Sequence, residues 1–469
     1  MSITTSQSCV TNLGDLVRDS GGNNTSLVQN PEQRIEWRDL LEGSVLHSRG
    51  DELQGRSVLI AIRSQLATIS ALLELDGIAR RIVLCPPDLS LEHLPYVIDI
   101  AQLDAIVTDQ ALTHLGKPRS LMFSAFSRRI LPREQHVRAE QQTEWILLTS
   151  GTTGLPKLVV HTLQSLTAAI QPRSAKDAQI VWSTFYDIRR YGGLQILLRA
   201  AIMGSSLVLS AAEESTADFL ARASSSGVTH ISGTPSHWRR ALMCSSAHLL
   251  KPKYVRLSGE AIDQAILNNL RPIYPDARIV HAFASTEAGV AFEVHDGVTG
   301  FPSSTLENTS GVEMKVQDGA LLIRSAGVAS CYLGDGAPLL KDESGFVDTR
   351  DIVELRDGRY YFSGRRDGVI NVGGLKVHPE QVEAVISRHP DVQMCLVRAQ
   401  KSRITGELVV ADVVLRTVDP PVELDVAMIQ TDILQLCRES LPAHKVPAAI
   451  HVVSTLGIGG SGKVMRQNA

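Results

Sequence analysis

The chain has 469 residues, of which 43% are hydrophobic and 20% are charged, values typical of a soluble globular protein. Its length corresponds to about three units of roughly 150 residues each, and its net charge of −4 argues against a nucleic-acid coat protein. The cysteines lie far apart without zinc-site spacing, and we find neither a signal sequence nor a membrane-spanning apolar run. We therefore expect a cytoplasmic protein with free thiols, no nucleic-acid partner and no membrane span, and the sequence leaves its oligomeric state open.

Residues 1–33 are rich in Ser, Thr, Asn and Gly, which predicts a loose N-terminal lead-in. Beyond them, short apolar strands alternate with stretches of helical periodicity, the pattern of a parallel α/β sheet with right-handed crossovers. The predicted strands are 58–62, 82–84, 104–107, 145–148, 207–209, 230–231 and 278–282, and the predicted helices are 66–78, 91–101, 165–170, 216–224 and 261–270.

After about residue 300 the pattern changes to short β segments with Gly and Asp turns, including a hairpin signal at Asp357-Gly358. The β segments are 313–316, 320–324, 352–355 and 359–363, followed by helices 379–389 and 426–440 and by strands 394–398, 409–415 and 450–453. The expected fold is α/β: an N-terminal core over 34–364 that contains a small β subdomain from about 300, then a small mobile α+β domain over 365–469.

A loop of hydroxyl-bearing residues and glycines, TSGTTGLPK, follows the predicted strand 145–148. Glycines let backbone N–H groups face an anion, while hydroxyls and a lysine add donors and charge. The loop is not a Walker A motif, because Gly151 and Gly154 are three apart and Pro156 precedes Lys157. We interpret it as a phosphate-binding loop, with a polar surface turn as the alternative. The candidate ligands are Thr149, Ser150, Gly151, Thr152, Thr153, Gly154 and Lys157.

Together with further segments in the same order, this loop resembles the adenylate-forming superfamily of acyl-CoA synthetases, non-ribosomal adenylation domains and luciferases. The resemblance extends from about residue 35 to Arg466. The segments are 149–157, 281–289, 347–351, 364–367 with 371–380, 441–447 and 460–466.

The resemblance implies an enzyme that uses ATP and Mg²⁺ to activate a small-molecule carboxylic acid as acyl-AMP, releasing pyrophosphate. The acyl group would then pass to a thiol, with CoA as the leading acceptor. The alternatives are the phosphopantetheine of an acyl carrier protein, another nucleophile such as an amine, or a non-catalytic nucleotide-binding relative. The sequence does not identify the acid.

The resemblance also assigns residues. Lys463 would stabilise the charge that develops at the α-phosphate, Thr286 would donate to that phosphate, and Glu287 would help to hold Mg²⁺. Without the other segments, Lys463 would be interpreted as a solvated lysine. Asp351 would accept the ribose hydroxyls and Arg365 would contact the ribose, while an aromatic ring at Phe283 would stack on adenine, with core packing as its alternative. The remaining adenine-side candidates are Gly259, Glu260, Ala261 and Ala284.

Asp367 resembles the hinge about which the C-terminal domain rotates between the two half-reactions, with a simple turn residue as the alternative. One orientation would bring in Lys463. The other would bring in the segment that contains Gly373, Gly374 and Lys376 for thioester formation.

The sequence departs from the family at three places, one of which is the turn Gly319-Ala320-Leu321, where the usual acid is missing. Asp187 stands near the position of the usual acyl-gate His, followed by Arg189 and Arg190, and Arg350 replaces the Gly of the Thr-Gly-Asp motif. One hypothesis is that Arg189 or Arg190 binds a polar or second carboxylate group of the substrate, and the alternative is a surface pair of salt-bridging arginines. The acyl-pocket candidates are Tyr186, Asp187, Arg190, Gly192, Trp238 and His281, with core packing equally compatible for Trp238 and His281.

Overall fold

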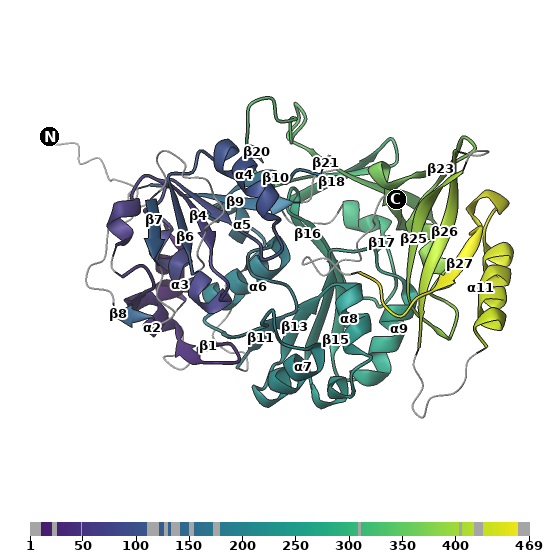
Figure 1. Ribbon diagram of the computed structural model, residues 1–469, viewed down its shortest axis with the longest axis horizontal. Helices are drawn as coiled ribbons and strands as arrows, with labels where there is room; N and C mark the ends of the chain where they lie inside the picture. The colour runs from purple at the N-terminus through teal and green to yellow at the C-terminus, as the bar shows by residue number, and fades with distance from the viewer. Residues whose placement is uncertain are drawn as a thin grey trace. The chain divides into compact units, whose positions relative to one another are not determined.

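The computed structural model describes residues 11–20, 26–47, 49–109, 122–125, 130–132, 141–149, 154–171, 179–307, 311–402, 406–416 and 425–457 (Figure 1). The chain divides into two compact units. The first contains the described residues of Met1–Ile231, Ala284–Val290 and Ser325–Gly345, and the second those of Ser232–Phe283, Ala291–Arg324 and Phe346–Ala469. The domain boundaries expected after residues 33 and 364 remain predictions, because this division does not test them.

A seven-stranded sheet forms the centre of the first unit, in the order β20-β10-β9-β5-β4-β6-β7. Strands β9, β5, β4, β6 and β7 are parallel, and β10 and β20 extend the sheet antiparallel. The apolar runs form strands because the sheet is covered on both faces. The strands are β4 (Ser57–Ala61), β5 (Arg81–Leu84), β6 (Ala105–Thr108), β7 (Met122–Ala125), β9 (Glu144–Thr149), β10 (Lys157–Thr162) and β20 (Cys331–Tyr332).

The helices that connect these strands include α3 (Gln65–Leu75) and α4 (Leu94–Ile100), the latter preceded by the short helix η2 (Leu91–His93). A second set of paired strands in this unit has the order β11-β12-β1-β2. Its elements are β1 (Leu27–Gln29), β2 (Arg34–Glu36), β11 (Val181–Thr184), β12 (Ser206–Leu209), α6 (Tyr191–Ile202) and α7 (Thr216–Ser225). Shorter elements are α2 (Trp37–Glu42), β3 (Gly43–Ser44), η1 (Gly50–Leu53), β8 (Leu131–Pro132) and α5 (Leu163–Thr167).

The predicted loose lead-in is wrong for the described part of residues 1–33. Helix α1 (Leu13–Asp19) starts at an Asn12 capping box and buries Leu13 and Val17. The Leu13 N–H donates to the buried carboxylate of Asp76 at 2.7 Å, and β1 pairs with β12 in parallel. The prediction failed because it relied on polar composition, which indicates neither the Asn12 cap nor the distant Asp76 contact that holds the helix.

The second unit begins with strands in the order β16-β15-β14-β13, followed by a β subdomain in the order β17-β22-β21-β19-β18. The first group comprises β13 (His230–Gly233), α8 (Pro235–Ala241), η3 (Ser245–Leu249), β14 (Tyr254–Ser258), α9 (Gln264–Ile273), β15 (Arg278–Ser285) and β16 (Gly289–Val294). The second comprises β17 (Phe301–Pro302), η4 (Ser303–Leu306), β18 (Val312–Gln317), β19 (Ala320–Ser325), β21 (Val347–Arg356), β22 (Arg359–Arg365) and η5 (Arg366–Gly368). Asp357 and Gly358 connect β21 and β22 with φ of 48° and 74°, which confirms the predicted hairpin turn.

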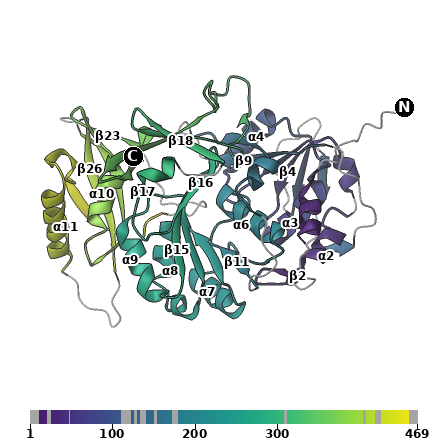
Figure 2. The same cartoon turned by 180° about the vertical axis from the view of Figure 1, so that it is seen from behind.

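The C-terminal part of this unit is a sheet in the order β24-β23-β26-β25, with β27 paired to β26 in parallel. Helices α10 and α11 pack on one another and on this sheet, and Figures 1 and 2 show α11 along its side. The predicted helix 426–440 is confirmed at both ends, whereas α10 stops three residues before the predicted end at 389. The elements are β23 (Ile370–Val372), β24 (Leu375–Val377), α10 (Pro379–Ile386), β25 (Val392–Ser402), β26 (Gly406–Leu415), α11 (Val426–Ser440), η6 (Ala443–Lys445) and β27 (Ala449–Val452).

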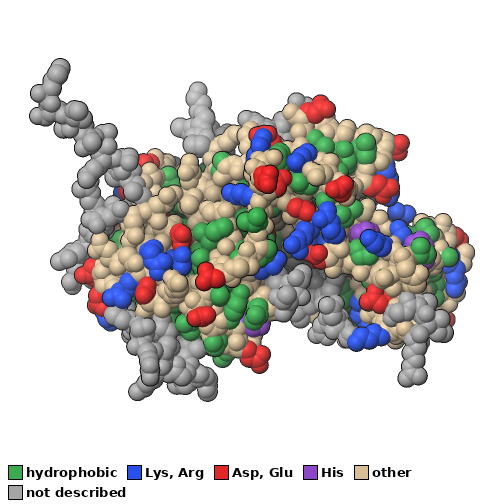
Figure 3. Space-filling view, turned by 90° about the horizontal axis from the view of Figure 1, so that it is seen from above, with side chains coloured by type: hydrophobic (Ala, Val, Ile, Leu, Met, Phe, Trp, Pro, Cys, Tyr) green, Lys and Arg blue, Asp and Glu red, His purple; other side chains and the backbone are tan. Residues whose placement is uncertain are grey.

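The structure confirms the predicted α/β class. No helix among the described residues has the length and apolar character needed to cross a membrane. Acidic and basic side chains are interspersed over the described part of the face in Figure 3, in keeping with the small net charge of −4.

Candidate active site

Strand β10 presents two different faces. Leu158 and Val160 point into a core cluster of the first unit, so the alternation of a β-strand puts Lys157, Val159 and His161 together on the opposite face. Lys157 is the end of the predicted phosphate loop, and His161 lies four residues further along the same face. The face therefore connects the predicted anion site to a buried histidine that the sequence analysis did not single out.

The neighbouring strands add side chains to this face. Thr149, the last residue of β9, pairs with Lys157 across the antiparallel ladder, and Tyr332 of β20 pairs with Val159 on the other side. Paired residues project to the same side of a sheet. The structure thus assembles a threonine, a lysine, a tyrosine and a histidine on one surface of the sheet.

The segment Ala284–Val290, which contains Thr286 and Glu287, belongs to the same unit as this face. The Nε2 atom of His161 lies 2.7 Å from the Thr286 carbonyl oxygen, and the Tyr332 hydroxyl donates to Oε1 of Glu287 at 3.3 Å. The Ala329 N–H donates to the Glu287 carbonyl at 3.0 Å. Two of the predicted catalytic residues, Thr286 and Glu287, are therefore held against the β10–β20 face.

The polar groups of this face fit a phosphate and a hard cation. Lys157 places its ammonium 5.2 Å above the centre of the Tyr332 ring, and no ion-pair partner for it occurs among the described residues. The buried Thr149 hydroxyl has no hydrogen-bond partner within the described part of the chain. Glu287 uses one carboxylate oxygen toward Tyr332, which leaves the other for a cation.

The described residues fit an Mg²⁺ site that the substrate phosphates would complete. No cluster of three or more metal-ligating side chains exists within the described part of the chain. Mg²⁺ commonly binds to one or two carboxylates together with substrate phosphates rather than to an all-protein cage. Glu287 is the described residue that would hold it here.

His161 is fully buried, and burial lowers its pKa to about 4, so the ring is neutral near pH 7. Because a carbonyl oxygen only accepts, Nε2 carries the proton that is donated to Thr286. The Nδ1 atom then faces the Ser165 hydroxyl at 2.9 Å. Sequence reasoning missed both His161 and Tyr332; the strand alternation after Lys157 was the available signal for His161.

Several predicted residues lie outside the described residues: Ser150, Gly151, Thr152, Thr153 and Lys463. Gly154 is described and has φ of +85°, with open space where a Cβ would lie. The roles of all six of these residues toward phosphate stay predictions.

In the second unit, β14 and β15 are parallel and in register, with Ser258 beside Ala282. Gly259 and Phe283, one residue further along each strand, therefore lie at the same edge of the sheet, where ligands bind in α/β folds. Gly259 has φ of +88°. The Glu260 carboxylate accepts from the Ser236 N–H at 2.9 Å and from its hydroxyl at 3.0 Å, which fixes the turn after β14. Ala261 follows this turn and Ala284 lies near the end of β15.

Phe283 belongs to an aromatic cluster. Its ring centre lies 5.4 Å from that of Phe362 and 5.8 Å from that of Phe292, with interplanar angles of 7° and 16°. These contacts fit the packing alternative for Phe283, and its stacking on adenine stays a prediction. The same strand that carries Phe362 also carries Arg365, so β22 links the aromatic cluster to the predicted ribose site.

Asp351 and Arg365 are cross-strand partners on β21 and β22. The Arg365 Nε lies 3.8 Å from an Asp351 carboxylate oxygen, and the Arg365 side chain is 59% exposed. The structure thus brings the two predicted ribose ligands together at an accessible place. The contact is long enough for both groups to turn toward a ligand.

The predicted hinge residue Asp367 lies in η5 and is paired with Arg350 at 2.8 Å. A second pair joins Arg366 to Asp348, also at 2.8 Å. Arg350 has φ of +63°, in the left-handed region that favours glycine. The residue that replaces the family's Gly therefore keeps the backbone conformation expected of Gly and adds a contact to the hinge.

The predicted thioester segment forms the β23–β24 hairpin. Gly373 and Gly374 have φ of 57° and 89°, and neither would bring a Cβ within 4 Å of another described atom. Lys376 is exposed on β24. The turn is accessible to a ligand, and its role toward a thiol stays a prediction.

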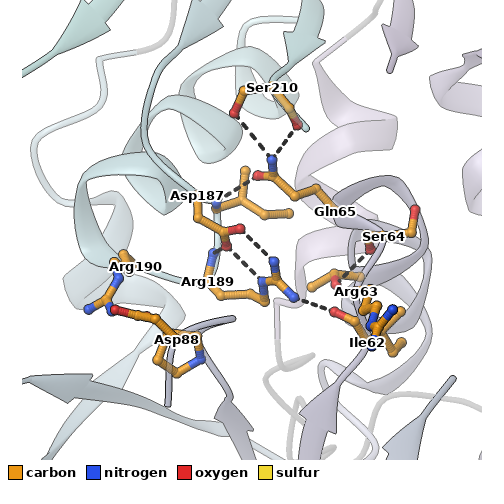
Figure 4. A network of polar contacts seen from close by, with 12 residues as sticks. Ile62, Arg63, Ser64, Gln65, Asp88, Asp187, Arg189, Arg190 and Ser210 are labelled. Atoms are coloured by element: carbon orange, nitrogen blue, oxygen red, sulfur yellow. Dashed lines mark hydrogen bonds and ion pairs between the residues drawn. The ribbon is translucent and has the colours of Figure 1, made fainter. Parts of the chain in front are cut away.

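The loop before α6 is built around an ion pair (Figure 4). The Arg189 guanidinium donates to both carboxylate oxygens of Asp187, at 2.7 and 2.5 Å, and to the Ile62 carbonyl. The Arg189 side chain is 3% exposed. The Ile188 N–H donates to Gln65 at 2.8 Å. Asp187 thus serves as the partner of a buried arginine.

Arg190 pairs with Asp88, and the rings of Tyr186 and Tyr191 are buried. A Cβ at Gly192 would lie 3.2 Å from the Tyr186 ring, so the glycine permits close packing of the loop on α6. Both arginines are engaged with protein carboxylates. That fits the salt-bridge alternative, although Arg189 is buried rather than at the surface, and substrate binding by either arginine stays a prediction.

Trp238 and His281 lie in the interior of the second unit. Trp238 is fully buried, donates from Nε1 to the Arg256 carbonyl at 3.4 Å and packs on Tyr274. His281 bonds through Nε2 to the Val298 carbonyl at 3.0 Å, and burial lowers its pKa. These contacts fit the packing alternative for both residues, and their acyl-pocket roles stay predictions.

Comparison with known proteins identifies relatives along most of the chain. Residues 43–333 match the model of the AMP-binding enzyme family, and residues 381–463 match that of the AMP-binding enzyme C-terminal domain. A 2-succinylbenzoate–CoA ligase of Salmonella typhimurium is 30% identical over 404 residues, covering 81% of this chain and 82% of that protein. A probable CoA ligase of Humulus lupulus is 26% identical and covers 68% of this chain and 64% of that protein.

Solved structures show the same fold. An anthranilate CoA ligase in complex with anthranoyl-AMP superposes with a TM-score of 0.81 at 17% identity, covering 97% of this chain and 95% of that one. A MenE variant of E. coli with bound OSB-AMS gives a TM-score of 0.75 at 20% identity, covering 95% and 96%. At these identities the likeness concerns the fold alone.

The family match covers more than half of the chain, and the Salmonella relative confirms it at 30% identity. These findings confirm the predicted class of reaction, an ATP-dependent, AMP-forming ligation of a carboxylic acid to a thiol. The chain belongs to the AMP-binding enzyme family.

Proposed function

We propose that this AMP-forming ligase activates an aromatic acid that carries a second carboxylate, of the 2-succinylbenzoate kind, and transfers it to CoA. The substrate class is supported by the Salmonella relative, which is named for 2-succinylbenzoate and matches over most of both chains. The chemistry is supported by one structural observation above all: Thr149, Lys157 and Glu287 are associated with one sheet face that offers a donor, a cation and a carboxylate.

In the first half-reaction, a carboxylate oxygen of the acid attacks the α-phosphorus of ATP and pyrophosphate leaves. Lys157 and Thr149 bind phosphate oxygens, and Lys463 stabilises the charge that develops on the α-phosphate. Thr286 donates to the same group. Glu287 would hold Mg²⁺, which would supply positive charge to the phosphates. Asp351 accepts the ribose hydroxyls, and Arg365 contacts the ribose from the next strand.

In the second half-reaction, the CoA thiolate attacks the acyl carbonyl and AMP leaves with the oxygen that came from the acid. Rotation about Asp367 replaces Lys463 by the segment of Gly373, Gly374 and Lys376. A Cβ at Gly373 or Gly374 would meet no described atom within 4 Å, which supports an accessible turn here.

The test is pyrophosphate release by the purified protein with Mg-ATP, across short, long, aromatic and dicarboxylic acids, with and without CoA. We expect the highest rate with an aromatic dicarboxylic acid, an increase with CoA, and loss of release in Lys463→Ala. Release with the acid that CoA does not change would point to a carrier protein or another nucleophile. No release with any acid would contradict the proposed function.

A further inference from the structure

Residues 286–288 connect β15 to β16 and include both Thr286 and Glu287. Connecting turns are commonly the mobile parts of a fold, whereas transition-state stabilisation needs groups fixed within fractions of an ångström. We propose that Tyr332 and His161 are positioning residues that hold this turn, and with it the Glu287 carboxylate, in its working orientation. The inference rests on the proposed adenylation reaction.

Tyr332 acts on the side chain of Glu287. Its hydroxyl donates to Oε1 at 3.3 Å, which restricts the rotation of the carboxylate and directs the other oxygen away from the tyrosine. The strand pairing fixes Tyr332 itself, since the flanking Leu333 N–H donates to the Leu158 carbonyl at 2.8 Å and the Ser330 N–H to that of Val160 at 2.7 Å.

The same tyrosine also touches the predicted phosphate lysine. The Lys157 ammonium lies 5.2 Å from the centre of the Tyr332 ring, a cation–π distance. One side chain therefore contacts both the Lys157 ammonium, which would bind phosphate, and the Glu287 carboxylate, which would hold Mg²⁺. The substitution Tyr332→Phe removes the hydroxyl that contacts Glu287 but keeps the ring that contacts Lys157, so it separates these two contacts.

His161 acts on the backbone one residue earlier. Its Nε2–H donates to the Thr286 carbonyl at 2.7 Å, and the ring is fully buried. Ser165 lies 2.9 Å from Nδ1, and the ring of Tyr191 packs at 5.7 Å, so the imidazole has little freedom. The peptide that joins Thr286 to Glu287 is thus held by a rigid donor from β10.

The backbone of this turn is closely packed against a neighbouring segment of the chain. Gly289 has φ of +75°, and a Cβ there would lie 2.5 Å from the Gly327 carbonyl oxygen. The Ala329 N–H donates to the Glu287 carbonyl at 3.0 Å. The turn therefore lies directly against the segment that leads into β20. This places Tyr332, which belongs to β20, close enough to contact Glu287.

The experiment compares Tyr332→Phe with Tyr254→Phe. The control removes a similar hydrogen bond, from the Tyr254 hydroxyl to Glu293 at 3.0 Å, between two residues that have no predicted role in the reaction. Mn²⁺ binding in the presence of ATP and absence of acid is followed by electron paramagnetic resonance, and Mg²⁺ dependence by ATP–pyrophosphate exchange. We expect Tyr332→Phe to weaken Mn²⁺ binding and to raise the half-saturating Mg²⁺ concentration by about tenfold. The KM for the acid and the melting temperature should stay unchanged, and Tyr254→Phe should behave as the native protein.

His161 is tested by two variants. His161→Gln keeps an N–H donor near the Nε2 position and should restore most of the metal response, whereas His161→Phe should weaken it. If His161→Phe does not fold, the His161→Gln variant and the pair of tyrosine variants still decide. Native metal binding in Tyr332→Phe would overturn the proposal.

The Mn²⁺ measurement needs no turnover, so it separates this inference from the proposed function. A native protein that binds Mn²⁺ with ATP but activates no acid would contradict the function alone. A loss of metal binding in Tyr254→Phe equal to that in Tyr332→Phe would contradict the positioning role alone.

Discussion

Two Arg–Asp pairs occupy two of the places where the sequence departs from the family, and they differ in burial. At the acyl-gate loop, Asp187 and Arg189 are 14% and 3% exposed. At the predicted hinge, Arg350 and Asp367 are 41% and 35% exposed. The same two residue types thus form an internal tie in one region and a surface contact in the other.

The difference shows how burial decides what an ion pair does. An exposed pair contributes only about 0–1 kcal/mol and is weakened by salt, which would suit the predicted hinge. A buried pair need not add stability, but breaking it leaves an unpaired charge inside the protein. We therefore interpret Asp187 as part of a fixed loop wall and Arg350 as a weak, reversible contact.

The largest effect is expected from Asp187→Ala. The guanidinium of Arg189 would lose a carboxylate that it contacts at two oxygens, and the free energy of unfolding should fall by about 3–5 kcal/mol. Urea denaturation followed by circular dichroism measures it. Asp88→Ala, which breaks the pair of the more exposed Arg190, is the control and should cost less. Equal losses of unfolding free energy in Asp187→Ala and Asp88→Ala would contradict the expected difference between the buried pair and the more exposed one.

An acid titration tests the effect of burial on another ionisable group, His161 of the first unit. Burial lowers the pKa of His161 to about 4, while an unfolded histidine titrates near its ordinary pKa of about 6.5. At this histidine the unfolded state therefore binds more protons between these values, and the contribution of His161 to stability must fall as the pH drops from about 6.5 to 4.

Thermal unfolding across this pH range measures the effect. His161→Gln removes the titration, so its melting temperature should decline less than that of the native protein. His237, whose pKa burial lowers to about 3, keeps part of the decline. Parallel pH profiles for the two proteins would show that His161 does not titrate as the structure requires.

The smallest effect is expected from Arg350→Gly. The change removes an exposed ion pair worth about 0–1 kcal/mol and relieves a left-handed backbone conformation that costs a non-glycine residue roughly 1–2 kcal/mol. The free energy of unfolding should stay within about 1 kcal/mol of the native value. Chemical denaturation at low and high salt tests this, with less salt dependence in the variant. A loss as large as that of Asp187→Ala would refute the weak hinge contact.

Local signals in the sequence are sufficient for some elements of the fold. Asp425 caps α11 through the Met428 N–H at 3.1 Å, and the helical periodicity that follows it predicts both ends of that helix. The turn at Asp357-Gly358 is equally local. Helix α1 was missed because its docking depends on Asp76, a partner far along the chain.

The sequence predicts which residues belong to the candidate site, but it does not predict how they are arranged in space. Motif resemblance pointed to Glu287 and Asp351, but the role of Tyr332 depends on the pairing of β20 with β10, which brings together segments far apart in the sequence. The burial of Arg189 likewise depends on the Ile62 carbonyl. Such long-range contacts leave no periodicity or spacing in the sequence.

The central claim is that the acid is activated through its own carboxylate oxygen as acyl-AMP. Incubation with Mg-ATP, CoA and an aromatic dicarboxylic acid labelled with ¹⁸O in its carboxylates tests this directly, with mass spectrometry of the nucleotide product. The account predicts AMP that carries one ¹⁸O atom from the acid, formed in step with the CoA thioester. Formation of ADP, or of AMP without label, would contradict it.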